Sequence, residues 1–266
     1  MEQTSSNAAE MPFLDHLEEL RWRIIWSLAA LVVGVVAAFF VVFRFNLLTW
    51  MQGPVLPYLH GHRLVYTHPG DGFSILMQTS IIVGVVLALP VILYQVYAFL
   101  SPALYRHEKR VVMPVIFGAV ALFVAGAALA WYFVLPMTLK FLSHLGDESF
   151  DQMITVSEYF GFVTSMVLAM GVVFELPIAI LILSAFGLVT PKFLAKFRRH
   201  AILGSYIAAA IITPGDLFVT SIALMVPLYM LYELSIILSY VVHRKRMKKQ
   251  AAEAAAEAAE GSGISA

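Results

Sequence analysis

The sequence predicts an all-α membrane protein whose six kinked transmembrane helices form a curved, concave bundle, with both termini in the cytoplasm. The first observation is composition: 61% of the 266 residues are hydrophobic, 13% are charged, and the mean hydropathy is +0.84. A soluble domain is about half apolar and about a quarter charged, so a lipid bilayer is the expected environment. The other two observations are a series of long apolar runs and an uneven distribution of Lys and Arg between them.

Six apolar runs approach the length of about 20 residues that a helix needs to cross the hydrocarbon core. Residues 1–23 are expected to form a cytoplasmic segment with an amphipathic helix, and residues 243–266 a basic flank with an Ala/Glu-rich tail. The first run begins only near Ile24, after several acidic residues, and therefore reads as a span and not as a cleavable signal. Within one transmembrane domain of residues 24–242, we expect spans near 24–43, 74–97, 112–135, 159–184, 201–215 and 217–242.

Lys and Arg lie almost entirely on one side of this arrangement. If the two tails share a side with segments 98–111 and 185–200, that side holds all of the 17 Lys and Arg residues except Arg44, Arg63 and Lys140. Basic residues in short loops favour the cytoplasm, so this side is predicted to be cytoplasmic. The first outer segment, residues 44–73, is rich in Gly and Pro and is predicted to form an ordered cap of turns and short helices.

Proline residues recur within or near the predicted spans. Each removes a backbone N–H and bends its helix where neighbouring groups can satisfy the freed carbonyl. The fifth span has only about 13 residues, or about 20 Å of helix against a core of about 30 Å, so local bilayer thinning is expected. We expect the fifth and sixth spans to be short and bends to occur at Pro90, Pro114, Pro136, Pro177 and Pro227.

The residues that common enzymes and cofactor sites require are missing. Cysteine is absent, which excludes disulfides, thiolate nucleophiles and thiolate metal sites. The sequence has no phosphate-binding glycine loop, HExxH motif or GxSxG elbow. We therefore expect no enzymatic activity, no cofactor and, given a formal net charge of zero, no nucleic-acid partner. The outer histidines His60, His62 and His68 are either a metal site or ordinary surface residues, and we predict no metal site from them.

Two polar patches lie on the predicted cytoplasmic side. In the amphipathic stretch 13–23, Glu19 and Arg23 have the spacing of an intrahelical ion pair, which contributes a few tenths of a kcal/mol. In the stretch 94–110, Glu108 is the only acid of the first cytoplasmic loop. An ordinary intrahelical pair and an ordinary solvated acid remain alternatives to a function for these two patches.

Two further patches lie within the membrane domain or at its outer edge. Glu175 lies in the middle of the fourth span, where a charged carboxylate costs about 2.5 to 3.5 kcal/mol on insertion scales. We therefore expect it to be protonated, paired or facing a water-filled cavity, and to have a function. Asp216 follows Pro214 in the tight outer turn Thr213-Pro-Gly-Asp, and capping of the sixth helix is the alternative explanation for it.

Taken in order, these patches resemble the motifs of the TatC family, the polytopic receptor subunits of the twin-arginine (Tat) protein translocase. The resemblance spans nearly the whole chain. It depends on His16-Leu-Glu-Glu-Leu-Arg21, Phe99-Leu-Ser-Pro-Ala-Leu-Tyr-Arg-His-Glu108, Phe174-Glu175-Leu-Pro177, and Thr213-Pro-Gly-Asp216 with Pro227 and Glu233.

The resemblance implies a core receptor that binds the twin-arginine signal peptides of folded proteins at the cytoplasmic face. Export would then proceed with the single-span partners TatA and TatB and be driven by the proton-motive force. It also implies a multi-pass protein of the bacterial cytoplasmic membrane that contacts the lipid bilayer and self-associates in a multimeric receptor complex.

The resemblance further implies roles for individual residues. Glu19 and Glu108 would contact the two signal arginines, and Glu175 would contact a partner or the signal peptide inside the membrane. A carboxylate binds the planar fork of a guanidinium through two hydrogen bonds that lysine cannot reproduce, so two acids can distinguish Arg from Lys. Residues implied to shape the site are Arg21, Phe99, Pro102 and Leu104, and the outer turn with Pro214 and Asp216 is implied to be structurally or functionally important.

A proton-coupled secondary transporter of a small solute is the alternative function. An acid at mid-membrane beside broken helices is typical of such transporters. However, the sequence lacks a convincing inverted repeat and has few polar residues within the spans. Protein translocation is therefore the favoured prediction.

Overall fold

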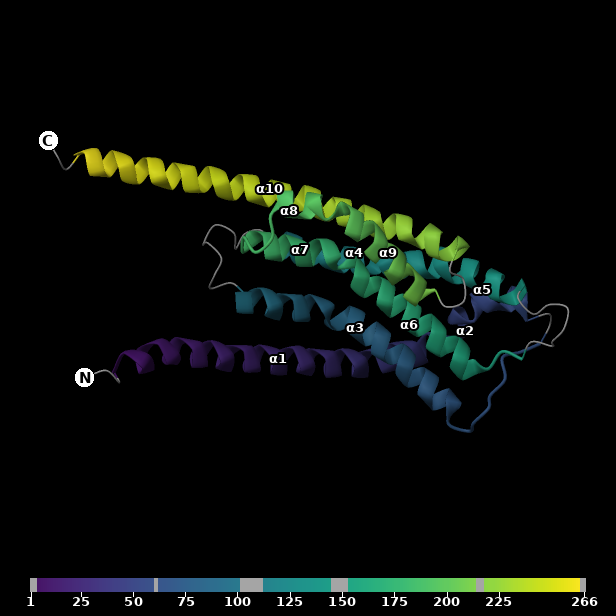
Figure 1. Cartoon of the computed structure of the whole chain (residues 1–266). Coiled ribbons are helices and arrows are strands. Elements are labelled where there is room, and N and C mark those ends of the chain that lie inside the picture. Colours follow the sequence, from purple (N-terminus) through teal and green to yellow (C-terminus); the bar gives the residue numbers. More distant parts are fainter. Residues whose placement is uncertain (1–3, 60–61, 101–111, 145–152, 214–217, 264–266) are drawn as a thin grey trace. The chain divides into compact units, whose positions relative to one another are not determined.

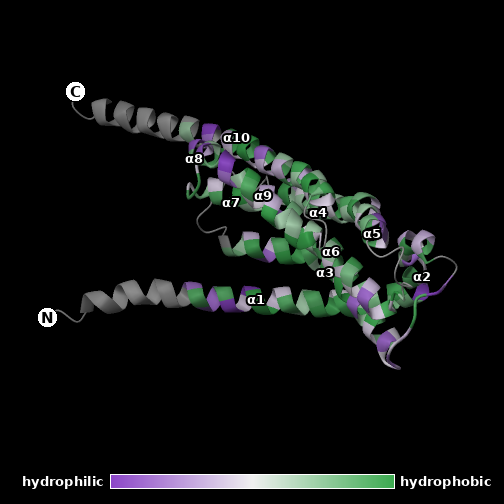
Figure 2. Cartoon of the chain, turned by 45° about the vertical axis from the view of Figure 1, so that its right-hand side comes forward, coloured by the Kyte–Doolittle hydropathy of each residue, from purple (hydrophilic) through white to green (hydrophobic). Residues whose placement is uncertain are grey.

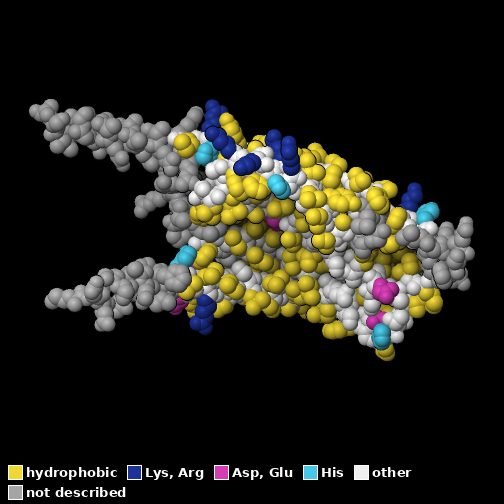
Figure 3. Space-filling view, in the orientation of Figure 1, with side chains coloured by type: hydrophobic (Ala, Val, Ile, Leu, Met, Phe, Trp, Pro, Cys, Tyr) yellow, Lys and Arg dark blue, Asp and Glu magenta, His cyan; other side chains and the backbone are white. Residues whose placement is uncertain are grey.

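The structure is a computed structural model of the whole chain, and it describes residues 4–59, 62–100, 112–144, 153–213 and 218–263 (Figure 1). Within these ranges the regular secondary structure is helical, apart from one isolated bridge between Val65 and Thr155. The chain divides into two compact units, Met1–Gly171 and Val172–Ala266. Many large hydrophobic side chains are exposed, and Figure 3 shows them over much of the molecular surface in view. Such a surface suits lipid and not water, as composition predicts.

Five helical stretches of the described residues are long and apolar enough to cross a membrane. They correspond to the first, second, third, fourth and sixth predicted spans, and Figure 2 shows their apolar stretches in green. The fifth predicted span is helix α9, Arg198–Ile212, whose 15 residues give about 22 Å of helix. Its shortness agrees with the prediction. The five longer stretches are His16–Arg44, Asp71–Phe99, Met113–His144, Val156–Ala185 and Val219–Arg244.

The sixth predicted span is not short, so that expectation is wrong. Helix α10 runs without a break through Val219–Gly263, and its apolar part alone, Val219–Arg244, has 26 residues. Ala and Glu are strong helix formers, so the backbone helix continues through the basic flank and into the tail.

The first unit contains two helices of 30 or more residues and several shorter elements. Helix α1 spans Thr4–Arg44 and includes the segment that the sequence places before the first span. The elements that follow are α2 (Leu47–Met51), the 3-10 helix η1 (Gly53–Tyr58), α3 (Asp71–Leu100), α4 (Val112–Leu129), the π-helix η4 (Ala130–Val134), α5 (Leu135–His144) and α6 (Val156–Phe174), whose last residues belong to the second unit.

Helices α1 and α3 run side by side and approach closely at two glycines (Figure 1). A Cβ added to Gly34 would lie 2.7 Å from the carbonyl oxygen of Gly84, and one added to Gly84 would lie 2.7 Å from the Cα of Val35. One turn further along each helix are the buried residues Ala38 and Ala88. Small residues spaced four apart allow backbones to approach closely, which is how membrane helices gain van der Waals contact.

The prolines lie in four different settings. Pro90 and Pro227 lie inside the continuous helices α3 and α10. Pro136 follows the wide π-helical turn η4, because a proline at this position cannot donate an α-helical bond to the carbonyl of Tyr132. Pro177 follows the break between α6 and α7 (Leu176–Ala185). Pro114 lies in the first turn of α4, where a proline is tolerated, so the expected bend at this position is wrong.

The described residues between α1 and α3, 45–59 and 62–70, form the ordered cap that the Gly and Pro content of this segment predicts. Asn46 adopts a left-handed conformation (φ 48°) that turns the chain into α2. The Tyr159 hydroxyl of α6 donates to the Met51 carbonyl at 2.7 Å, and the Val65 backbone pairs with the strand-like start of α6. Asp71, the first residue of α3, accepts hydrogen bonds from the backbone N–H groups of Thr67 and His68, each at 2.9 Å. These bonds attach the cap to α3 and α6.

The second unit packs α7, α8 (Pro191–Lys196) and α9 against α10. Its core includes Ile180, Leu194 and Ile236. The Tyr232 hydroxyl donates to the Leu194 carbonyl at 2.7 Å, and the buried hydroxyls of Ser184 and Ser239 hydrogen-bond to each other. These pairs satisfy polar groups that would otherwise be buried without partners in an apolar bundle.

Candidate functional site

The ends of α1 and α3 that are predicted to be cytoplasmic form a polar and aromatic cluster. The His16 ring of α1 stacks on the Phe99 ring of α3, with centroids 4.4 Å apart and planes at 14°. Glu19 lies one turn after His16, and its Oε2 is 3.9 Å from His16 Nδ1. The cluster therefore brings together Glu19 and Phe99, two residues that the sequence assigns to one site although they are far apart in the chain.

Arg23 connects this cluster across the two helices. Its guanidinium donates one hydrogen bond to Glu19 Oε1 at 3.0 Å and another to Gln95 Oε1 on α3 at 3.1 Å. The Arg23 and Glu19 side chains are 31% and 33% exposed, so solvent screens the ion pair. Pairs of this kind contribute about 0.2 to 1 kcal/mol. A competing guanidinium that approaches Glu19 would therefore meet only a small energetic barrier from Arg23.

The other residues that the sequence assigns to this site are only partly visible. Arg21 is described and exposed. Pro102, Leu104 and Glu108 lie outside the described residues. Resemblance alone therefore places Pro102, Leu104 and Glu108 at the site, while the structure describes Glu19, Arg21 and Phe99.

Sequence reasoning missed Gln95 and the double role of Arg23. The (i, i+4) spacing predicts the Arg23–Glu19 pair, but it gives no information about a partner on another helix. A useful signal was available, because Gln95 is a polar residue within three turns of apolar sequence on α3. Such residues in membrane helices usually hydrogen-bond to a neighbouring helix.

Glu175 occupies the break between α6 and α7. Its backbone has helical angles (φ −76°, ψ −9°), its N–H donates to the Val172 carbonyl, and its own carbonyl accepts from Ile178 and Ala179. Both carboxyl oxygens are buried and have no hydrogen-bond partner among the described residues. The sequence allows Glu175 to be protonated, paired or facing a water-filled cavity. An ion pair between Glu175 and another described residue is therefore absent. A carboxyl group in this position is expensive to retain in a charged form.

The outer turn with Pro214 and Asp216 lies outside the described residues. Next to it, the buried Thr213 hydroxyl donates to the Ala209 carbonyl at 2.7 Å and lies 3.0 Å from the Ser221 hydroxyl. His60 also lies outside the described residues, and among those that are described no cluster of His, Asp or Glu is arranged to bind a metal ion.

Glu233, another motif residue, connects two helices of the second unit. It accepts a hydrogen bond from Arg198 of α9 at 2.9 Å and one from the Tyr229 hydroxyl at 2.6 Å. This network fixes the start of the short helix α9 against α10.

Comparisons with known proteins agree on one family. Residues 15–227 match the family model described as Sec-independent protein translocase protein (TatC). A TatC protein of Aquifex aeolicus is 39% identical over 91% of this chain and 100% of its own length. TatCy of Bacillus subtilis is 34% identical over 94% of this chain and 97% of its own length. A crystal structure of the twin-arginine translocase receptor TatC superposes with a TM-score of 0.71 at 37% identity, covering 85% of this chain and 99% of the other.

The family match covers four of the motifs that carry the resemblance, including the stretch around Glu19 and the helix break at Glu175. These relatives are protein translocase components and not enzymes, and none of them supports a transporter of small solutes. The chain is a multi-pass, all-helical membrane protein that belongs to the TatC family of Sec-independent protein translocases.

Proposed function

We propose that this chain is the receptor component of a twin-arginine translocase and binds twin-arginine signal peptides at the cytoplasmic ends of α1 and α3. One structural observation carries the proposal: His16, Glu19, Arg23 and Phe99 form a single cluster between two helices. A carboxylate beside an aromatic ring offers a guanidinium both a charge-assisted hydrogen bond and a face on which to stack. The solved structure of a related protein is described as a twin-arginine translocase receptor, which supports the same assignment.

In this proposal Glu19 binds one signal arginine and Glu108 the other, while Arg21, Phe99, Pro102 and Leu104 shape the site. Glu175 binds a partner helix or the apolar part of the signal peptide inside the membrane, and the turn at Pro214 and Asp216 supports the outer face. The receptor acts with TatA and TatB, self-associates, and uses the proton-motive force.

The proposal also includes the location and topology of the chain. We place it in the bacterial cytoplasmic membrane with both termini in the cytoplasm. Residues 1–23 and 243–266 flank a transmembrane domain of residues 24–242. The distribution of Lys and Arg supports this orientation, since all but three of them lie on the assigned cytoplasmic side.

Site-specific photocrosslinking tests the binding proposal. Membranes that contain the full chain, with a photoreactive residue in place of exposed Trp22 or Val96 in turn, are exposed to a twin-arginine signal peptide. We expect adducts at each position, and their loss when the two signal arginines are replaced by lysines. Persistent adducts with the lysine peptide, or none with the arginine peptide although the protein is folded, would contradict the proposal.

Two neighbouring acids on α1, Glu18 and Glu19, allow a matched comparison. The affinity of each variant for the same signal peptide is measured in a binding assay. Glu19→Gln removes a charge-assisted interaction and should lower affinity by at least about tenfold. Glu18→Gln alters an adjacent, exposed acid and should change affinity by less than about twofold. Equal effects of the two substitutions would mean that the acids contribute only general electrostatic attraction.

A further inference from the structure

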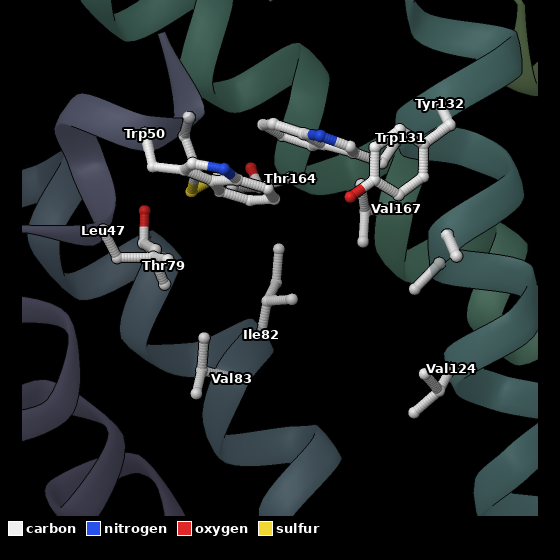
Figure 4. Close-up of a pocket in the computed structure, with 13 residues that line it drawn as sticks. Leu47, Trp50, Thr79, Ile82, Val83, Val124, Trp131, Tyr132, Thr164 and Val167 are labelled. Atoms are coloured by element: carbon white, nitrogen blue, oxygen red, sulfur yellow. The ribbon is translucent and has the colours of Figure 1, made fainter. Parts of the chain in front are cut away.

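The first unit contains an apolar cavity beneath the cap segment, away from the polar cluster of α1 and α3. It has a volume of about 270 Å³ and is lined by residues of α2, α3, α4, η4 and α6. Figure 4 shows the two tryptophan rings on one side of the cavity and aliphatic side chains on the other. Residues that define it include Trp50, Thr79, Ile82, Val124, Trp131 and Val167.

One hydroxyl in the cavity wall is unusual. Thr79 is only 1% exposed, and its Oγ1 has no hydrogen-bond partner among the described residues. Thr164, which also lines the cavity, instead donates to the Phe160 carbonyl of its own helix at 2.6 Å. The buried hydroxyls of Ser80 and Thr138 likewise donate to carbonyls four residues earlier. Of these four hydroxyls, Thr79 alone has no acceptor within the described part of the chain. Leaving a buried donor unpaired is unfavourable.

Two tryptophan rings cover one side of the cavity. Trp50 of α2 and Trp131 of η4 stack with ring centroids 4.3 Å apart and planes at 11°. Tryptophan is enriched at the boundary between lipid headgroups and hydrocarbon, where its ring is apolar and its N–H can meet polar groups. Thr79 lies two turns into α3, about 12 Å from the helix start at Asp71. The cavity is therefore near the headgroup boundary of one leaflet.

We propose that this cavity binds one acyl chain of a membrane phospholipid, with the Thr79 hydroxyl donating a hydrogen bond to the ester carbonyl. The apolar wall excludes a charged ligand. An ester carbonyl only accepts hydrogen bonds, so it matches a single unused donor. The lipid comes from the leaflet next to the cap, which is the outer leaflet in the orientation proposed above. This inference does not depend on signal-peptide binding.

Photolabelling with a lipid tests this proposal. The purified full chain is placed in phospholipid nanodiscs that contain a trace of phosphatidylethanolamine with a diazirine on one acyl chain. After irradiation, adducts are mapped by mass spectrometry. We expect adducts on the cavity residues in 124–132 to exceed those on the exposed face of α1 around Val33 and Phe40. Labelling in simple proportion to exposure would overturn the proposal.

Paired variants separate cavity binding from general lipid contact. Ala127→Phe fills the cavity and should reduce cavity adducts about tenfold, whereas Ala125→Phe, on the exposed side of the same helix, should leave them within about twofold. The proposal would be overturned if both substitutions reduced the number of cavity adducts to the same extent. A protein chain that crosslinks to a photoreactive residue at position 127 in native membranes would also overturn it.

A second pair tests the hydrogen bond. Thr79→Val should reduce cavity adducts about fivefold, and Thr79→Ser, which keeps the hydroxyl, should retain them. Thr164→Val removes a hydroxyl that already bonds within its helix and should have little effect. Equal labelling of Thr79→Val and the unaltered chain would overturn the role of Thr79. Thermal unfolding of each variant confirms that it is folded, and Thr79→Val should be no less stable, because it removes an unpaired buried donor.

Discussion

Arg23 on α1 donates a hydrogen bond to Gln95 on α3 at 3.1 Å, while the same guanidinium holds Glu19 at 3.0 Å. One side chain thus joins two helices and occupies a carboxylate that is proposed to bind an arginine of the signal peptide. In the free protein Arg23 stands where the guanidinium of a ligand would bind. We therefore expect binding to be an exchange of one arginine for another.

The first prediction concerns this exchange. Arg23→Gln removes the internal competitor of the signal arginine, and an exposed pair of this kind is worth about 0.2 to 1 kcal/mol. Affinity for a twin-arginine peptide should therefore rise by about two- to fivefold. Titration of a fluorescent signal peptide against the purified protein measures the change.

Gln95→Leu is the matched control for Arg23→Gln. It removes the bond between the helices but leaves Arg23 paired with Glu19, so it should not raise affinity. A fall in affinity with Arg23→Gln as large as that of Glu19→Gln would show that Arg23 supports the site and does not compete for it.

The second prediction concerns the contact that sets the distance between α1 and α3. Gly34 and Gly84 lie about 16 Å, or three helical turns, from Arg23 and Gln95 respectively. A Cβ at Gly84 would lie 2.7 Å from the Val35 backbone, so the helices must separate. Gly84→Ala should lower the free energy of unfolding by about 1 to 3 kcal/mol and weaken peptide binding.

Gly118→Ala on α4 is the control for this substitution. A Cβ there meets no atom within 4 Å, so stability should stay the same or rise by up to about 1 kcal/mol. Unfolding in detergent micelles, followed by tryptophan fluorescence, measures both variants. Equal stability of Gly84→Ala and Gly118→Ala would mean that α1 and α3 can separate at this contact with little loss of free energy.

Much of this architecture was predictable because each prediction depended on a local property. Hydropathy and length identify five long spans and the short α9, and the Gly and Pro content of residues 44–73 identifies the cap. The motif around Glu175 identifies the helix break, since Pro177 removes a backbone donor there.

The unpredicted features are those that depend on pairing between distant residues. Arg23 and Gln95 are 72 positions apart, and no local spacing connects them. Likewise, the stack of Trp50 on Trp131 depends on how α2 and η4 pack. Packing of α3 also decides that the Thr79 hydroxyl finds no partner in the ranges that the structure describes. The expectation of a short sixth span was wrong although its predicted bounds, 217–242, already give a length equal to the 26 residues of Val219–Arg244.

The third prediction concerns the attachment of the cap to α3. Asp71 is 7% exposed and accepts two backbone N–H bonds and the Thr67 hydroxyl, the last at 3.2 Å. Asp71→Ala leaves these donors unpaired and should destabilise the protein by about 1 to 2 kcal/mol. Hydrogen exchange at residues 65–71 should become faster. Asp71→Asn keeps one acceptor oxygen and should lose less stability, so an equal loss in both variants would contradict this account.

The last prediction separates a structural role of Glu175 from a functional one. Its carboxyl oxygens are buried without a partner among the described residues, so the protein gains no hydrogen bond by keeping the group ionisable. Glu175→Gln has nearly the same shape, and unfolding in detergent should therefore show equal or greater stability. Export of a reporter protein with a twin-arginine signal should nevertheless fall by at least about tenfold, because loss of a charge-assisted contact costs about 1.5 to 3 kcal/mol.

Glu158→Gln is the control for this substitution. It alters an exposed acid at the start of α6 and should change neither stability nor export. Normal export by Glu175→Gln and Glu175→Ala would remove Glu175 from the mechanism. A marked loss of stability would instead indicate a partner within the chain, and the carboxyl group would then be explained by folding alone.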